Sequence, residues 1–305
     1  MRRCPDNRSG CIEERRVSHE IETRRYVMPS GIEIAADVGG APSRPAVILM
    51  HGGGQTRHSW GGAMRELLRQ GYHVINFDAR GHGDSSWAPD ADYSLTTMAN
   101  DLRAIIATLP SPPALVGASM GGATSLYACG DAAAKGETLA AALVVVDIVP
   151  RVDRKGAEKI AAFMGAHTNG FATLEDASDA VAAYNAHRPR PKDPSGLMKN
   201  LRRHADGRLY WHWDPAFVTR ASRAEPPQMA TLLLEAAGRV RVPTLLVRGM
   251  QSDIVSEEGV EEFRRHLQGL EVYDVVGAGH MVAGDRNDAF NEGVIGFLRR
   301  HLPEA

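Results

Sequence analysis

The sequence has 305 residues, a size that allows one large domain or two smaller ones and a sizeable buried core. Apolar residues make up 43% and charged residues 24% of the chain, which excludes a disordered or fibrous protein as the expected class. The formal net charge of −2 gives no strong field for attracting nucleic acid or a membrane surface, so we expect neither as a partner.

No targeting or membrane-spanning segment is visible in the sequence. The basic N-terminal residues are not followed by the apolar stretch that a secretory signal requires, and no apolar run has the length of a membrane span, so we expect a cytoplasmic protein. Residues 1–23 are charged and lack periodicity, which predicts a flexible tail. Cys4, Cys11 and Cys129 have no spacing typical of a metal site, and their odd number argues against a disulfide framework.

The pattern after the tail predicts a sheet flanked by helices. Residues 24–40 contain two extended stretches around Pro29-Ser30-Gly31, which predicts an antiparallel hairpin. Short apolar runs then alternate with helical periodicity, and most of the runs lack the in/out alternation of a half-solvated sheet. We therefore predict an α/β fold with a doubly wound, mostly parallel sheet. The expected strands are residues 46–50, 73–77, 114–117, 142–149, 244–249 and 270–276, and the expected helices are residues 61–70, 95–109, 121–131, 256–267 and 286–301.

One long interval interrupts this alternation. Residues 150–236 follow the sixth expected strand and combine helical stretches with a proline-interrupted basic segment. We predict that they form a helical cap over the carboxyl edge of the sheet. The core then consists of residues 24–149 and 237–305.

Polar residues gather directly after the expected strands. Ligands bind outside the carboxyl ends of the strands in open α/β sheets, so these residues form the candidate site. Ser119 lies in a Gly-x-Ser-x-Gly stretch that follows a strand and opens a helix, which is the pattern of a nucleophile elbow. A helix N-cap is the alternative role for Ser119. Asp253 and His280 follow later strands, so serine, aspartate and histidine occur in that order at strand ends.

Together these motifs resemble the α/β-hydrolase fold superfamily, in a form with a helical cap. The resemblance covers about residues 24–302. The surroundings are similar to the epoxide-hydrolase-like and peroxidase-like branches, but epoxide hydrolases and haloalkane dehalogenases carry an aspartate at the elbow where this chain has Ser119. A serine favours acyl chemistry on esters, lactones or thioesters. The motifs that carry the resemblance are HGGG at 51–54, FDARGHGDS at 77–85, GASMGG at 117–122, SD at 252–253 and GAGH at 277–280.

The resemblance implies a catalytic triad. Ser119 would be the nucleophile and His280 its base, because a serine hydroxyl is a poor nucleophile at neutral pH. A buried carboxylate must orient that imidazole and offset its developing charge, and we assign this role to Asp253. Asp147 is the alternative, since a few members of the superfamily draw their acid from the end of this earlier strand.

The resemblance also implies an oxyanion hole made of backbone N–H groups. One donor is expected from Met120, directly after the nucleophile, and the other from Gly53 or Gly54. His51 is expected to brace this loop rather than to take part in the reaction.

Substrate choice should lie in the cap, above the rigid sheet edge. Trp211, Trp213, Tyr184 and His187 are candidate substrate-binding residues, and packing of the cap onto the core is their alternative role. The basic residues of segment 188–192 could grip a carboxylate substrate or form a solvated loop.

These observations predict a serine hydrolase that cleaves a small carboxylic ester or lactone through an acyl-enzyme, as a monomer or homodimer, with no cofactor and no metal. A carbon–carbon bond hydrolase or a perhydrolase with the same triad is one alternative. A non-catalytic ligand-binding protein of the same fold is another, although such a protein has no chemical need for both a triad and an oxyanion loop.

Overall fold

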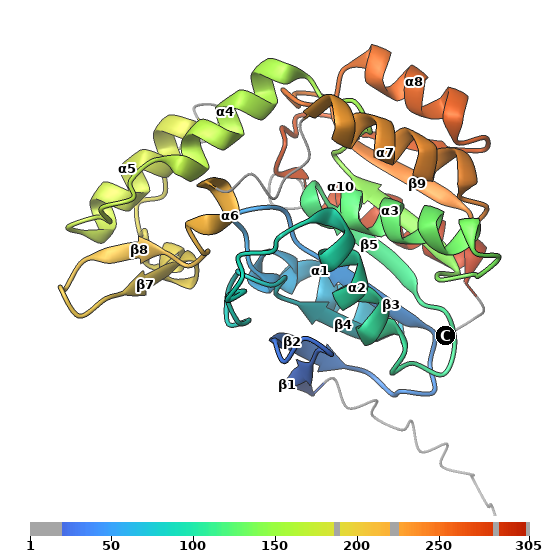
Figure 1. Ribbon diagram of the computed structural model, residues 1–305, viewed down its shortest axis with the longest axis horizontal. Coiled ribbons are helices and arrows are strands. Elements are labelled where there is room, and N and C mark those ends of the chain that lie inside the picture. Colours follow the sequence, from blue (N-terminus) through green and yellow to red (C-terminus); the bar gives the residue numbers. More distant parts are fainter. Residues whose placement is uncertain (1–19, 186–189, 220–225, 283–286, 303–305) are drawn as a thin grey trace, which may run out of the picture.

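The computed structural model describes residues 20–185, 190–219, 226–282 and 287–302 (Figure 1). Most of the predicted tail lies outside the described residues. The last part of the predicted tail, residues 21–23, belongs to the first strand, which begins at Ile21.

The described residues form an eight-stranded sheet in the order β1-β2-β4-β3-β5-β6-β9-β10. The predicted hairpin is confirmed, since β1 pairs antiparallel with β2, and β2 pairs antiparallel with β4. The remaining neighbours pair in parallel, which confirms the predicted fold class. The strands are β1 (Ile21–Val27), β2 (Glu33–Gly39), β3 (Ala46–Met50), β4 (His73–Phe77), β5 (Ala114–Ala118), β6 (Ala142–Val146), β9 (Thr244–Gly249) and β10 (Glu271–Val275).

The central strands are buried on both faces because successive side chains enter two different cores. In β3, Ile48 and Met50 belong to one cluster, whereas Val47 and Leu49 belong to the other. Helices α1 (Gly61–Arg69) and α10 (Asn287–His301) supply the cluster that contains Val47. Helices α2 (Leu95–Ile106), α3 (Met120–Ala134), α7 (Pro226–Arg239) and α8 (Glu257–His266) supply the cluster that contains Ile48.

The cap differs in extent and composition from our expectation. It contains α4 (Arg154–Gly165), α5 (Leu174–Tyr184), η2 (Ser195–Asn200) and α6 (Ala216–Thr219), together with a small antiparallel sheet of β7 (Leu201–Arg203) and β8 (Leu209–Trp211). In Figure 1 these elements stand to one side of the main sheet. Helix α7, which we placed in the cap, instead packs against α3 of the core, because small residues allow a close approach of the two helices.

Strand β3 lies between β4 and β5 in the sheet. The chain therefore passes from β3 to β4, toward one edge of the sheet, and later enters β5 next to β3 on the side of the opposite edge. Such a point of reversal leaves a crevice at the carboxyl ends of the two strands that flank it. The glycine loop, defined as residues 51–54, follows β3 and Ser119 follows β5, so both border this crevice.

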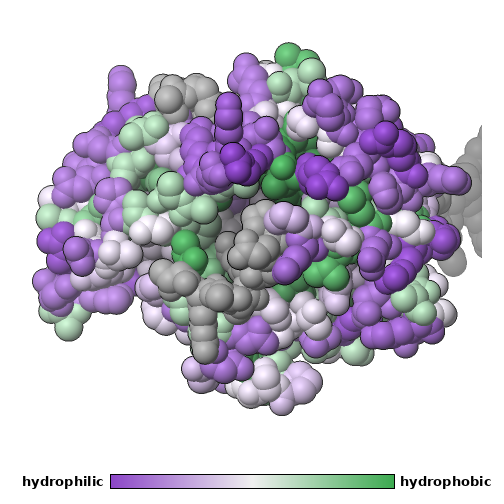
Figure 2. All heavy atoms as spheres, turned by 45° about the horizontal axis from the view of Figure 1, so that its top comes forward, coloured by the Kyte–Doolittle hydropathy of each residue, from purple (hydrophilic) through white to green (hydrophobic). Residues whose placement is uncertain are grey.

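The surface offers no broad apolar face in the view of Figure 2, where hydrophobic side chains are scattered among hydrophilic ones. In the part of the chain that the structure describes, no helix is both long and apolar enough to cross a membrane.

The close packing of α3 on α7 predicts that alanine substitution changes the stability in opposite directions at two helical glycines, Gly130 and Gly238. A Cβ at Gly130 would lie 2.5 Å from the Cα of Ala236, so Gly130→Ala should lower the free energy of unfolding by roughly 1–3 kcal/mol through overpacking. A Cβ at Gly238 of α7 would lie 3.9 Å from its nearest atom. Gly238→Ala should therefore raise the free energy of unfolding by roughly 0.5–1 kcal/mol through helix propensity. Urea unfolding of both variants measures the two effects, and equal stabilisation would contradict the tight contact.

Candidate active site

Ser119 occupies a strained turn between β5 and α3. Its backbone has φ 46° and ψ −110°, a conformation that non-glycine residues rarely adopt and that is retained where the surroundings enforce it. The Ser119 N–H donates to the carbonyl of Val146 at 2.9 Å, so the last rung of the β5–β6 ladder holds the turn. This geometry confirms the strand–turn–helix context that the motif predicted.

Glycines let the strand and the helix meet at this turn. A Cβ at Gly121 would lie 2.5 Å from the carbonyl oxygen of Met50, and a Cβ at Gly122 would lie 2.7 Å from that of Gly117. Any larger residue would push α3 away from the sheet and displace Ser119. Because Met120 is the first residue of α3, its N–H has no acceptor within the helix and is available to an anion.

Asp147 and His280 are joined by a hydrogen bond next to the turn of Ser119. Asp147 directly follows β6, and Ala118 pairs with Val146 in the sheet, so Ser119 and Asp147 leave neighbouring strands at the same level. His280 Nδ1 lies 2.8 Å from Asp147 Oδ2. An imidazole that donates its Nδ1 proton to this carboxylate carries its lone pair on Nε2, the nitrogen that can act as a base.

The carboxylate of Asp147 is fully buried and held by further donors. The Gly249 N–H donates to Oδ1 at 2.9 Å, and the Ser252 hydroxyl donates to Oδ2 at 2.6 Å. Asp147 also has a positive φ of 49°, so its backbone, like that of Ser119, is held by its surroundings in a rare conformation. Three donors from two segments, the turn that ends β9 and the loop that carries His280, therefore fix the orientation of this carboxylate.

The assignment of the triad acid to Asp253 is not what the structure shows. The carboxylate of Asp253 is partly exposed and forms an ion pair with Lys159 of α4 at 2.9 Å. Partial burial alone would raise the pKa of Asp253. The Lys159 ammonium nevertheless holds this pKa below its ordinary value. Asp253 thus joins the cap to the core, whereas the alternative residue, Asp147, takes the position next to His280.

The glycine loop lies beside Ser119. A Cβ at Gly52 would be 3.4 Å from the Cβ of Ser119. The carbonyl of Gly52 accepts from His51 Nδ1 at 2.8 Å and from the Gln55 N–H at 3.1 Å. Because the N–H and C=O of a trans peptide point in opposite directions, these two bonds turn the Gly53 N–H away from His51.

Gly53 and Gly54 are the two glycines expected to supply a donor to an oxyanion hole. The Gly54 N–H donates to His82 Nε2 at 3.2 Å, so it is already engaged in the fold. His51 braces the loop as expected, since its Nε2 accepts from the Ala79 N–H at 2.9 Å while its Nδ1 donates to Gly52. Burial lowers the pKa of His51 and keeps this imidazole neutral.

His82 and His212 contact the loop from two further directions. The His82 ring lies 5.2 Å from that of His51 and 5.8 Å from that of His212. His212 accepts the Gly83 N–H on Nδ1 at 2.7 Å and donates Nε2–H to the Gly54 carbonyl at 3.3 Å. Burial, with the nearby imidazole of His51 second, lowers the pKa of His212 to about 3. Among the described residues, no group of three or more His, Cys, Asp or Glu side chains could hold a metal ion.

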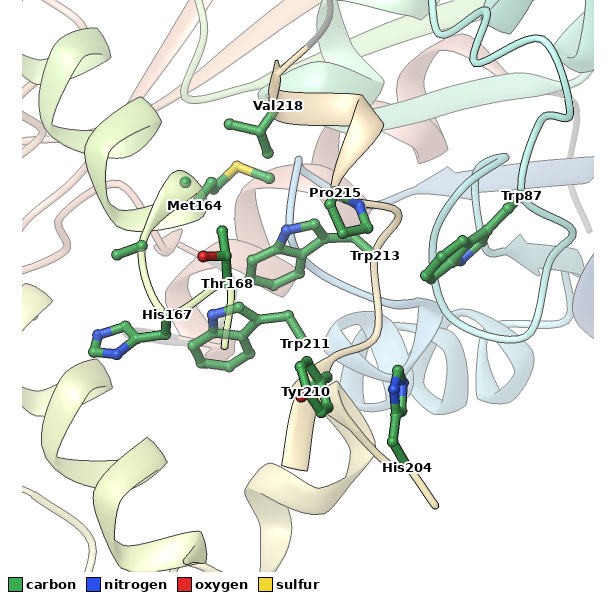
Figure 3. Close-up of a pocket in the computed structure, with 12 residues that line it drawn as sticks. Trp87, Met164, His167, Thr168, His204, Tyr210, Trp211, Trp213, Pro215 and Val218 are labelled. Atoms are coloured by element: carbon green, nitrogen blue, oxygen red, sulfur yellow. The ribbon is translucent and has the colours of Figure 1, made fainter. Parts of the chain in front are cut away.

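Cap residues cover the glycine loop. A Cβ at Gly53 would lie 3.6 Å from Phe217, and one at Gly54 would lie 3.3 Å from Met164 and 3.4 Å from Trp213. Beyond Met164 and Trp213, the cap and Trp87 of the core enclose a cavity of about 60 Å³ (Figure 3). Its lining contains no Asp, Glu, Lys or Arg, so it suits a small uncharged group.

The proposed cap residues divide into different roles. Trp211 and Trp213 both line the cavity and stack with their ring centroids 4.8 Å apart. Tyr184 stacks on Phe163 and lies outside the cavity lining. Burial, with the Asp253 carboxylate second, raises its pKa to about 12. His187 lies outside the described residues.

A profile of the alpha/beta hydrolase fold family matches residues 45–286 of this chain, which is most of its length. The chain belongs to the alpha/beta hydrolase family. It is 31% identical to esterase Rv0045c of Mycobacterium tuberculosis over 84% of this chain and 83% of that protein. It is 27% identical to the sn-1-specific diacylglycerol lipase ABHD11 of Mus musculus, over 85% of this chain and 82% of that protein.

Solved structures agree with the fold of this hydrolase. The crystal structure of esterase Rv0045c superposes with a TM-score of 0.71 at 27% identity, covering 92% of each chain. The crystal structure of E-2-(acetamidomethylene)succinate hydrolase superposes with a TM-score of 0.78 at 23% identity, covering 92% of this chain and all of that one. The named relatives are esterases and other hydrolases, so this chain is a hydrolase.

Sequence reasoning missed three residues that shape the hydrolase site. Ser252 directly precedes Asp253 and supports Asp147, and Phe217 covers Gly53 from the cap. The Gln55 side chain accepts from the Gly52 N–H at 3.1 Å. Gln55 directly follows the HGGG motif, which is a usable signal, whereas nothing local marks Phe217.

The identity of the acid can be tested by neutralising each aspartate in turn. Asp147→Asn removes the negative charge beside His280 and should lower kcat by roughly 10³–10⁴-fold on a p-nitrophenyl ester, as loss of a triad acid does elsewhere. Asp253→Asn removes only the ion pair with Lys159 and should retain activity within a few-fold of the wild type. The reverse order of activities would restore Asp253 as the acid.

The buried histidines predict a stability change with pH. His212 is neutral in the folded protein down to a pKa of about 3, whereas its ordinary value is 6.5, so the unfolded chain binds more protons between these values. The contribution of neutral His212 to the free energy of unfolding is complete above pH 6.5. It is lost as the pH falls toward 3, at up to about 1.4 kcal/mol per pH unit. His212→Gln should therefore show a flatter fall of unfolding free energy below pH 6.5, measured by urea unfolding. Parallel pH profiles for variant and wild type would refute the burial of a neutral ring.

Proposed function

We propose that this hydrolase cleaves a small carboxylic ester or lactone through Ser119, His280 and Asp147 with an acyl-enzyme intermediate. The observation that carries the proposal is the His280–Asp147 hydrogen bond beside the strained turn of Ser119. A nucleophile, a base and an acid that orients the base are the parts that acyl transfer requires.

The mechanism follows from the positions of these groups. The Ser119 hydroxyl attacks the substrate carbonyl while His280 Nε2 takes its proton, and the buried Asp147 carboxylate stabilises the imidazolium. The N–H groups of Met120 and Gly53 stabilise the tetrahedral oxyanion, at a few kcal/mol each. His280 then protonates the leaving alcohol, and a water activated by the same imidazole hydrolyses the acyl-enzyme.

The cap supports an uncharged substrate. The cavity beyond Met164 and Trp213 has no Asp, Glu, Lys or Arg in its lining, so it favours an uncharged part of a substrate over a carboxylate. Of the basic segment that could have gripped a carboxylate, Arg190 already pairs with Asp179 on α5. The named relatives include an esterase and a lipase, both of which act on ester bonds.

The proposal is tested by active-site labelling combined with a substrate panel. A fluorophosphonate probe should label the wild type on Ser119 and should leave Ser119→Ala unlabelled, because phosphonylation needs an activated serine. Short p-nitrophenyl esters and simple lactones should be hydrolysed by the wild type only. Failure of labelling would favour a ligand-binding protein, and turnover of vinylogous diketones without ester hydrolysis would favour carbon–carbon bond cleavage instead.

A further inference from the structure

Gly54 is held on both sides by histidines from different parts of the molecule. Its N–H donates to His82 Nε2 at 3.2 Å, and its carbonyl accepts from His212 Nε2 at 3.3 Å. His82 belongs to the loop after β4 in the core, whereas His212 directly follows β8 in the cap. Gly54 has φ +73°, a conformation that glycine adopts readily, so its backbone needs outside contacts to hold one geometry.

The hydrogen bonds fix which nitrogen of His212 carries the proton. Nδ1 accepts the Gly83 N–H at 2.7 Å, so this nitrogen is unprotonated and the proton lies on Nε2, where Gly54 accepts it. The side chain is 1% exposed, so water does not compete for either bond. One imidazole therefore connects the glycine loop, the 81–84 loop and the cap.

Neighbouring bonds dock the same cap segment firmly onto the core. The Asp214 N–H donates to the Gly81 carbonyl at 2.9 Å, and the Tyr93 hydroxyl donates to the Asp214 carboxylate at 2.5 Å. Arg202 of β7 pairs with Asp84 at 2.7 Å. Because His212 lies between these contacts, its ring is positioned only when this part of the cap is docked.

The position of Gly54 matters because Gly53 precedes it. The Gly53 N–H is fixed from the N-terminal side by the bonds to the Gly52 carbonyl, and the glycine loop is fixed from the C-terminal side by the bonds to Gly54. An oxyanion donor acts only if it is already oriented when the charge develops. Freeing one end of a run of three glycines would let the donor move by far more than this chemistry tolerates.

We propose that His212 is a positioning residue of the cap that orients the oxyanion loop, so that the hydrolase is fully active only when the cap is docked. The proposal rests on the proposed function, because it assigns the Gly53 N–H to oxyanion binding. His212 acts through Gly54 and touches no reacting atom.

Two amide substitutions separate the bonds that His212 makes. In His212→Gln the side-chain amide reaches the position of Nε2 and can still donate to Gly54, whereas in His212→Asn it reaches the position of Nδ1 and can accept only from Gly83. We expect His212→Asn to lower kcat by about 10–100-fold with KM changed less than about 3-fold, and His212→Gln to recover most of that loss. The exposed His266 on α8 supplies the control, and His266→Asn should match the wild type.

A transition-state analogue distinguishes this role from mere support of the fold. A boronic acid, which forms an oxyanion on the serine, should bind His212→Asn more weakly by the same factor as the loss in kcat, while both variants remain folded, with a cooperative unfolding transition, at a pH above 6.5. Equal kinetics for the Asn and Gln variants, or a loss confined to KM, would overturn the proposal.

A measurement without substrate separates this inference from the proposed function. Nitrogen-15 NMR of the wild type should show His212 neutral with its proton on Nε2, and a proton on Nδ1 would overturn the inference even in an active enzyme. A wild type that fails to hydrolyse esters and to react with the fluorophosphonate, yet shows this tautomer, would contradict the proposed function and leave the connection between cap and loop in place.

Discussion

The hydrogen bond from the Ser119 N–H to the Val146 carbonyl sets the relative positions of Ser119 and Asp147. It is the last rung between two buried parallel strands, and beyond it both chains turn sharply into positive φ, at Ser119 and at Asp147. Each such turn costs of the order of 1–3 kcal/mol, which the packed sheet supplies. The proposed nucleophile and the proposed acid are thus placed by the register of the sheet, whereas His280 lies on a loop.

The glycine loop on the other side of the site depends on a different constraint, namely which ring nitrogens of the buried histidines carry protons. A run of glycines gives the backbone access to the reacting carbonyl but no rigidity of its own. His51 within the glycine loop, and His82 and His212 that contact it, supply that rigidity, since all three are fully or almost fully buried. A neutral imidazole suits this role because it donates with one nitrogen and accepts with the other.

The fold and the turn at Ser119 could be predicted because they rest on local patterns. Three expected strands, 46–50, 73–77 and 244–249, match the observed bounds, and the glycine-flanked Ser119 forms the expected turn. The acid could not be chosen this way, because Asp147 and Asp253 both follow strands and differ only in what reaches them through space. A lysine from the cap reaches Asp253, while Gly249, Ser252 and His280 converge on Asp147. The end of the cap was misplaced for a similar reason, since the partner of α7 is a glycine about 100 positions earlier.

The use of Asp147 has a structural consequence for the loop after β9. Because the proposed acid directly follows β6, residues around Asp253 are not needed to orient His280 and instead contact the start of the cap. The Asp153 N–H donates to the Ile254 carbonyl at 2.9 Å, Gly156 packs without a side chain against the backbone of Asp253, and Lys159 pairs with its carboxylate. Cap attachment and the orientation of Asp147 meet at Ser252, whose hydroxyl donates to Asp147 and accepts from the Ile254 N–H. At the other junction His212 connects the cap directly to the glycine loop. Substitutions in α4 can thus reach Asp147 through Ile254 and Ser252, whereas changes near His212 reach the glycine loop directly.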